Sequence, residues 1–221
     1  MRNWRRKPGL VRALIACGLW AIVSNARADE LLVRVVGNDQ EPVPGVAVFV
    51  RQPDSQRAQP AAAVMDQRDQ HFVPHVLIVQ KGAAVEFPNS DVIAHHVYSF
   101  SKPNNFELPL YKGSPPDPVL FDHEGNVTLG CNIHDSMIGY IVVVDTDVFT
   151  MTDTDGVARL TVDGDASRWE VNIWSPRIRD SRDPLVEVIE AGESLTATFA
   201  LRKKLRPPHD DHSESLTWHD Y

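Results

Sequence analysis

The sequence predicts an all-β protein, and three observations lead to this prediction. Apolar residues occur in short alternating or β-branched runs rather than at helical spacing. Turn residues separate these runs at intervals typical of β-sandwiches. The chain of 221 residues holds 16 Pro, which remove backbone donors and break helices, so a helical bundle is disfavoured.

Residues 1–28 have the pattern of a secretory signal peptide. Basic residues precede an uncharged apolar run, Ala13 to Val23, and Ala26-Arg27-Ala28 supplies a small-x-small cleavage pattern. The apolar run is shorter than the ~20 residues that span a bilayer, which disfavours an uncleaved anchor. We therefore expect cleavage before Asp29 and a periplasmic protein with no stable membrane insertion afterwards. The export route stays open.

The charge of the remaining chain limits its partners. The full sequence has 22 basic and 30 acidic residues, a net charge of −8. Six of the basic residues and none of the acidic ones lie in residues 1–28, so the exported part carries −14. An acidic body disfavours nucleic acid as a partner and is compatible with a basic protein partner.

The strands are expected in the following order along the chain, each bounded by Gly, Pro, Asn or Asp. The first two, Leu31–Val36 and Val43–Val50, are separated by a Gly-Asn-Asp turn. The polar segment 53–69 and the Pro-rich segment 102–118 are expected to be connections. The other predicted strands are Phe72–Val79, Ala84–Phe87, His95–Phe100, Val119–Phe121, Val127–Leu129, Ile138–Val144, Val157–Val162, Trp169–Trp174, Val186–Ile189 and Leu195–Leu201.

One short segment contains several side chains that can bind a metal. The residues from Cys131 to Met137 read C-x2-H-x2-M, with His134 between them. Because Cys17 leaves with the signal peptide, Cys131 is the single thiol of the exported chain, and an intramolecular disulfide is impossible. A thiolate, imidazoles and a thioether form the ligand set of a blue-copper site.

The second imidazole has to come from elsewhere in the chain. His95-His96 lies 36 residues before Cys131, after a Pro-Asn-Ser-Asp loop and at the start of a predicted strand. Neighbouring residues in a strand point to opposite faces, so we expect only one of the two to face the metal. The residues alone leave the choice between them open.

The segment from Phe72 to Val144 resembles the cupredoxins. The resemblance rests on Phe72-x-Pro74, on Val79-x-x-Gly82-x-x-Val85-x-Phe87-x-Asn89, on His95-x-Val97 and on the Cys131–Met137 loop. The short loop is most similar to that of amicyanin. HHVYSFS, FELPLY and LGCNIHDSMIGYIVVVDT resemble periplasmic blue-copper proteins often labelled as methylamine-utilisation proteins.

The resemblance implies a Greek-key β-sandwich that binds one type 1 copper ion. Its ligands would be His95, Cys131, His134 and Met137. In two places the chain departs from the family pattern. His96 stands where Asn is common, and Val127–Gly130 replaces the usual aromatic strand before the Cys; both bear on the redox potential.

The flanks resemble a different domain. LLVRVVGNDQEPVPGVAVFV and TDTDGVARLTV…WEVNIWSPRI are similar to strands of a carboxypeptidase-regulatory-like sandwich. We therefore expect accessory strands in 29–60, a copper domain in 61–146, the remaining accessory strands in 147–202 and a disordered tail in 203–221. The role of the His residues in that tail stays open.

These features together predict a periplasmic type 1 copper protein that transfers one electron at a time between redox protein partners. Four protein ligands leave a mononuclear copper without an open position, so we expect no enzymatic activity. Apolar surface at Ile133 and Ile138 would contact the partners. The alternatives are copper storage or delivery, and a metal that merely stabilises the fold. The sequence does not indicate the partners or the oligomeric state.

Overall fold

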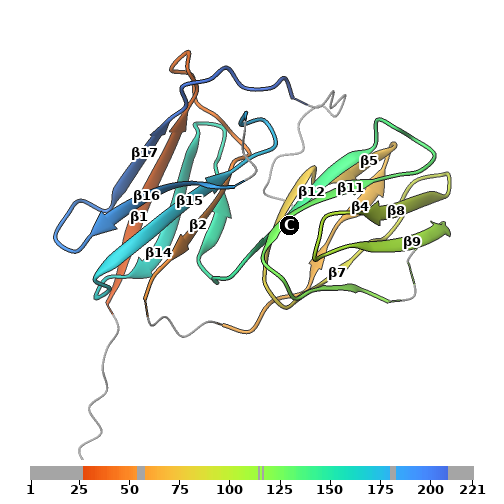
Figure 1. Cartoon of the computed structure of the whole chain (residues 1–221), viewed down its shortest axis with the longest axis horizontal. Coiled ribbons are helices and arrows are strands. Elements are labelled where there is room, and N and C mark those ends of the chain that lie inside the picture. Colours follow the sequence, from red (N-terminus) through yellow and green to blue (C-terminus); the bar gives the residue numbers. More distant parts are fainter. Residues whose placement is uncertain (1–26, 54–57, 114, 116, 180–182, 209–221) are drawn as a thin grey trace, which may run out of the picture.

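The computed structural model describes residues 27–53, 58–113, 115, 117–179 and 183–208. Within these ranges the chain forms seventeen strands and no helix, which confirms the all-β prediction. Consequently no helix of the described chain is long and apolar enough to cross a membrane. The strands build two lobes that lie side by side (Figure 1).

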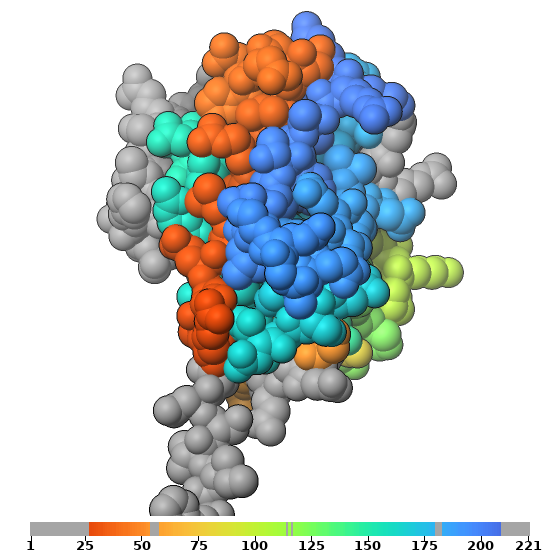
Figure 2. Space-filling view, turned by 90° about the vertical axis from the view of Figure 1, so that its left-hand side faces the viewer, coloured from red at the N-terminus to blue at the C-terminus, as the bar shows by residue number. Residues whose placement is uncertain are grey.

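The flanking lobe consists of strands from both ends of the described chain. One sheet has the order β14-β1-β17 and the other β13-β2-β15-β16. Figure 2 shows the first sheet from outside, with the N-terminal and C-terminal strands side by side. The strands are β1 (Ala28–Val36), β2 (Ala47–Arg51), β13 (Phe149–Met151), β14 (Val157–Asp163), β15 (Arg168–Trp174), β16 (Leu185–Glu190) and β17 (Thr196–Ala200).

The central lobe contains the strands between them. A five-stranded sheet of order β6-β12-β11-β8-β9 faces a three-stranded sheet of order β10-β7-β3, and β4 and β5 form a hairpin. The strands are β3 (Ala63–Val64), β4 (Asp66–Arg68), β5 (His71–Val73), β6 (Val76–Gln80), β7 (Ala83–Glu86), β8 (His95–Ser99), β9 (Phe106–Tyr111), β10 (Val119–Phe121), β11 (Gly125–Gly130) and β12 (Ile138–Val144).

Each lobe has its own core because alternate strand residues point inward. In the flanking lobe Val33 and Val48 are fully buried, and in the central lobe Val85 and Ile141 are. Burying one such side chain contributes about 1.5–3 kcal/mol relative to leaving it exposed. The central core also contains Cys131 and therefore reaches the candidate site.

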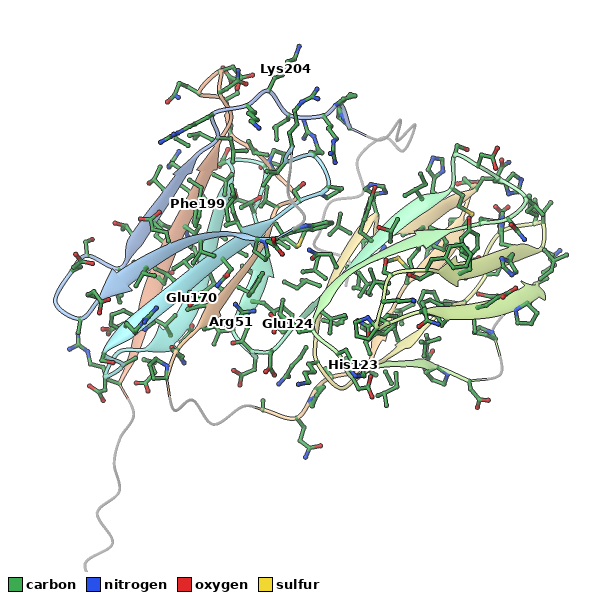
Figure 3. All side chains as sticks on the ribbon, viewed as in Figure 1. Arg51, His123, Glu124, Glu170, Phe199 and Lys204 are labelled. Carbon is green, nitrogen blue, oxygen red and sulfur yellow. The ribbon has the colours of Figure 1, made fainter. Side chains whose placement is uncertain are left out.

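A third apolar cluster joins the two lobes. Phe49 and Trp174 of the flanking lobe pack with Val142 of the central lobe, and the Trp174 ring lies 5.7 Å from that of Tyr140. Beside the cluster, the Arg51 side chain forms ion pairs with Glu124 of the central lobe and with Glu170. Figure 3 shows Arg51 and Glu124 where the lobes meet. The β12 strand, which follows the candidate ligand loop, is thus packed on both faces.

The two predicted connections contain strands. The segment 53–69 includes β3 and β4, and 102–118 includes β9, although Pro109 lies within it. β9 is the edge strand of its sheet and its register with β8 is irregular, so the missing amide of Pro109 removes no ladder hydrogen bond that the sheet requires. The second predicted strand begins later than expected, at Ala47, because Gly45 adopts a positive φ of 67°.

Three sequence predictions are not tested by this structure. The signal peptide lies outside the described residues except for Arg27 and Ala28, and the tail is described only to residue 208. The domain boundaries stay a proposal. Among the described strands, those before residue 52 and after residue 148 share sheets with one another and not with the strands between them.

Candidate metal centre

Three side chains with metal-binding atoms converge at one end of the central lobe. One ligand atom each from His95, Cys131 and His134 lies within 4.8 Å of the others. Cys131 Sγ is 3.8 Å from His95 Nδ1 and 4.0 Å from His134 Nδ1. The structure thus brings together three of the four side chains that the sequence predicted as ligands.

Strand pairing explains why these residues meet. Gly130, the last residue of β11, is paired with Tyr98 of β8 on one side and with Ile138 of β12 on the other. The ends of the three strands therefore lie together, and Cys131 follows directly. The loop then returns, and the Met137 amide donates a hydrogen bond of 3.0 Å to the His134 carbonyl.

The structure places His95 and not His96 in the cluster. The His95 ring is completely buried and directs Nδ1 toward Cys131. The His96 ring points to the other face of β8, where its Nε2 lies 3.0 Å from a carboxylate oxygen of Glu107. The alternation expected for neighbouring strand residues accounts for this difference.

The Asp91 carboxylate orients the His95 ring. His95 Nε2 lies 2.8 Å from Asp91 Oδ2, and both side chains are buried. An ionised carboxylate only accepts hydrogen bonds, so the His95 Nε2–H donates to Asp91 and the other ring nitrogen, Nδ1, faces Cys131. A metal-binding His commonly has such a partner on its second nitrogen.

Backbone amides hold Asp91 itself. The Gln70 amide donates to Asp91 Oδ2 at 2.9 Å, and the Val92 amide donates to Oδ1 at 2.6 Å. Burial raises the pKa of the Asp91 carboxyl, but the hydrogen bonds from His95 and from these two amides outweigh it, and the pKa is lowered overall. Sequence analysis assigned Asp91 only to a loop. The one feature of the sequence that could have indicated the contact is the position of Asp91 four residues before His95.

Met137 is buried but is not part of the three-residue cluster. Its side chain is 1% exposed and packs in the same core as Cys131. Met137 and Cys131 also line one recess of about 490 Å³, together with Tyr98 and Phe100. Its role as the fourth ligand stays a prediction.

The donor set fits one metal ion. Two imidazole nitrogens and one thiolate lie close enough for a single ion to reach all three at the ~2.0–2.3 Å typical of such bonds. His95 and Cys131 are buried, whereas His134 is partly exposed. An ion there would be shielded from water on the core side and would lie near the surface at His134.

Exposed apolar side chains lie in the two loops that carry candidate ligands. Val92 is 81% exposed and Ile93 is 37% exposed, both in the loop that precedes His95. Ile133, which neighbours His134, is 52% exposed. Ile138, predicted to belong to the same surface, is partly exposed and lines the recess beside Cys131 and Met137.

A scan against protein-family models and a search of curated proteins each find no match. Among solved structures, the chain is similar to cupredoxins over part of its length. A purple cupredoxin from Nitrosopumilus maritimus is 19% identical, with a TM-score of 0.33, and the match covers 38% of this chain and 99% of that one. An amicyanin mutant in its reduced Cu(I) form at pH 4 is 20% identical, with a TM-score of 0.35 over 43% of this chain and 99% of that one.

A third match is longer in this chain but partial in the other. The Cu-containing nitrite reductase from Thermus scotoductus SA-01 is 22% identical, with a TM-score of 0.36, covering 50% of this chain and 28% of that one. Cupredoxins are thus among the solved structures that are similar to part of this chain. The resemblance of the flanks to a carboxypeptidase-regulatory-like sandwich stays a prediction.

Proposed function

We propose that this protein is a periplasmic electron carrier in which His95, Cys131 and His134 would hold one type 1 copper ion, with Met137 as a fourth, weaker ligand. The observation that carries the proposal is the convergence of one thiolate and two imidazoles within 4.8 Å at the end of a β-sandwich. Two imidazoles and one thiolate, with a thioether nearby in the chain, are the donor set of blue-copper sites, whereas calcium sites use oxygen ligands. Copper bound there supplies reversible one-electron chemistry.

The residues of the site differ in their structural roles. His95 is held from both sides, by its position in β8 and by the 2.8 Å contact with Asp91, so its ring is pre-oriented before any metal binds. Cys131 and Met137 are 3% and 1% exposed and exclude water from the core side. Pre-orientation of this kind limits rearrangement of the ligands, which favours fast electron exchange.

His134 is the ligand that lies nearest the surface, and the exposed Val92 and Ile133 belong to the two loops that carry ligands. Exposed apolar side chains in the loops that carry the ligands would suit short-lived contacts with redox proteins. The acidic charge of the chain would attract a basic partner at long range. We include the periplasmic location and the absence of enzymatic turnover in this proposal.

The visible and electron paramagnetic resonance spectra of the copper-loaded protein test it. We expect an intense thiolate-to-copper absorption in the wild type and its loss in Cys131→Ser. His123→Ala is the matched control, because His123 is more than half exposed and bonds to Asp122 rather than to the cluster. A colourless wild-type protein, or a Cys131→Ser variant that keeps the band, would contradict the proposal.

A second measurement separates electron transfer from copper storage or delivery. An electron carrier should pass through repeated reduction and oxidation with its copper retained. A delivery protein should instead lose Cu(I) to a chelating acceptor within the same cycles. Cyclic voltammetry followed by metal analysis of the recovered protein distinguishes the two.

A further inference from the structure

A recess in the flanking lobe, far from the candidate metal centre in the sequence and the fold, has the features of a ligand site. It has a volume of about 520 Å³ and lies between the start of β16 and the end of β17. β16 and β17 are the edge strands of the two facing sheets, so the sandwich is open on this side. Small-molecule sites typically occupy about 300–1,000 Å³.

The interior of the recess is apolar. Ile178, Phe199 and Leu201 are 5%, 8% and 7% exposed and belong to the core of the flanking lobe. Leu185 and Val186, on β16, are 40% and 52% exposed. An exposed apolar pair on an edge strand is unfavourable in water unless something covers it.

The rim of the recess is cationic, although the chain as a whole is acidic. Arg179, Arg202 and Lys203 line it, and Glu187 is the one acidic residue among the described residues of the lining. The whole chain carries a net charge of −8, so the sign of the charge is reversed locally. Apolar walls with cations at one margin match a ligand that has an apolar body and an anionic end.

Hydrogen bonds hold the segment that follows β17 in place over this end of the lobe. The Arg206 amide donates to the Arg177 carbonyl at 2.8 Å, and Arg179 Nε donates to the Lys204 carbonyl at 2.8 Å. Figure 3 shows Lys204 on the segment that crosses the top of the flanking lobe, with Phe199 on β17 below it. The cations at the rim are therefore carried by an anchored segment.

We propose that this recess binds a single-chain anionic amphiphile, such as a fatty acid or the acyl chain of an anionic lipid. The alkyl chain would cover Leu185 and Val186 and contact Phe199. The anionic head would lie against Arg202 and Lys203. The proposal is independent of the metal centre, because it involves the other lobe.

Calorimetric titration of the full-length protein with dodecanoate, below the concentration at which it forms micelles, tests the proposal. We expect saturable binding of one dodecanoate, and much weaker binding of dodecyl maltoside and of dodecyltrimethylammonium. The double variant Arg202→Glu/Lys203→Glu should bind dodecanoate at least about tenfold more weakly, because it replaces both cations that face the anionic head by carboxylates. Val186→Ser should weaken it about threefold or more through lost apolar contact.

Matched controls separate these contacts from general surface effects. Leu120→Ser removes an apolar side chain that is 60% exposed on the central lobe, and Arg159→Glu reverses an exposed charge on β14 at the far edge of the same sheet. Neither should change the affinity. All the substituted side chains are exposed, and thermal unfolding of each variant checks that it folds.

The source of the amphiphile is decided by sedimentation with vesicles. If the protein binds dodecanoate but does not sediment with phosphatidylglycerol vesicles, the ligand is a free amphiphile. If the protein sediments with phosphatidylglycerol vesicles, but not with phosphatidylcholine vesicles, and the double variant does not sediment with either, the ligand is a membrane lipid. Equal binding of the neutral or cationic detergent, or unchanged affinity in Val186→Ser and in the double variant, would overturn the proposal.

Discussion

Replacing Asp91 by Asn removes the negative charge that faces His95 while it leaves a side chain of nearly the same shape. In the native protein the carboxylate accepts a hydrogen bond from His95 Nε2 at 2.8 Å, with the two side chains 7% and 0% exposed. Because both side chains are largely shielded from solvent, the charge contributes to holding Nδ1 toward Cys131.

The size of the effect follows from the difference between two kinds of hydrogen bond. A hydrogen bond to a charged group contributes about 1.5–3 kcal/mol, and a neutral one about 0.5–1.5 kcal/mol. The asparagine amide oxygen still accepts a hydrogen bond, so the expected loss is the difference between the two ranges, about 1–1.5 kcal/mol. This corresponds to about tenfold weaker metal binding.

Competition between the protein and a chromophoric Cu(I) chelator measures the affinity. The matched control is Glu107→Gln, which makes the same chemical change beside the neighbouring His96. The Glu107 side chain is 73% exposed, and His96 points away from the cluster, so this variant should bind copper as the wild type does.

Two results would refute the reasoning. If Asp91→Asn bound Cu(I) with unchanged affinity, the carboxylate would not be orienting His95. If Glu107→Gln weakened binding as much as Asp91→Asn, the effect would come from the general charge of the region rather than from the contact with the ligand.

Three further predictions concern stability, each measured by denaturant unfolding. Gly139→Ala should destabilise the protein by about 1–3 kcal/mol, because its Cβ would lie 2.7 Å from Phe72 Cβ in the core; an unchanged midpoint would contradict this. Burial raises the pKa of Tyr111 from 10.0 to about 12. Its neutral form therefore contributes stability that is complete below pH ~10 and is lost as the pH rises toward ~12, a decline that Tyr111→Phe should reduce. Arg51→Ala should cost no more than about 1 kcal/mol, because its ion pair with Glu124 is partly exposed; a larger loss would show that the pair holds the lobes together.

Several elements could be predicted from local sequence. The Ile138–Val144 and Val119–Phe121 strands agree with the prediction residue for residue, because β-branched and aromatic runs bounded by turn residues identify buried strands. The C-x2-H-x2-M loop was equally visible, since Cys131, His134 and Met137 are close in the chain. β9 was missed because Pro109 disfavours a strand in general and is tolerated here only at a sheet edge.

The sequence by itself determined the all-β class, the approximate strands and the donor types of the candidate site, because these depend on the properties of neighbouring residues. Only the tertiary structure decided that His95 rather than His96 faces Cys131 and that Asp91 orients it. It also revealed the recess between β16 and β17. These features join segments far apart in the chain, and their positions depend on sheet pairing and core packing, which no local pattern encodes.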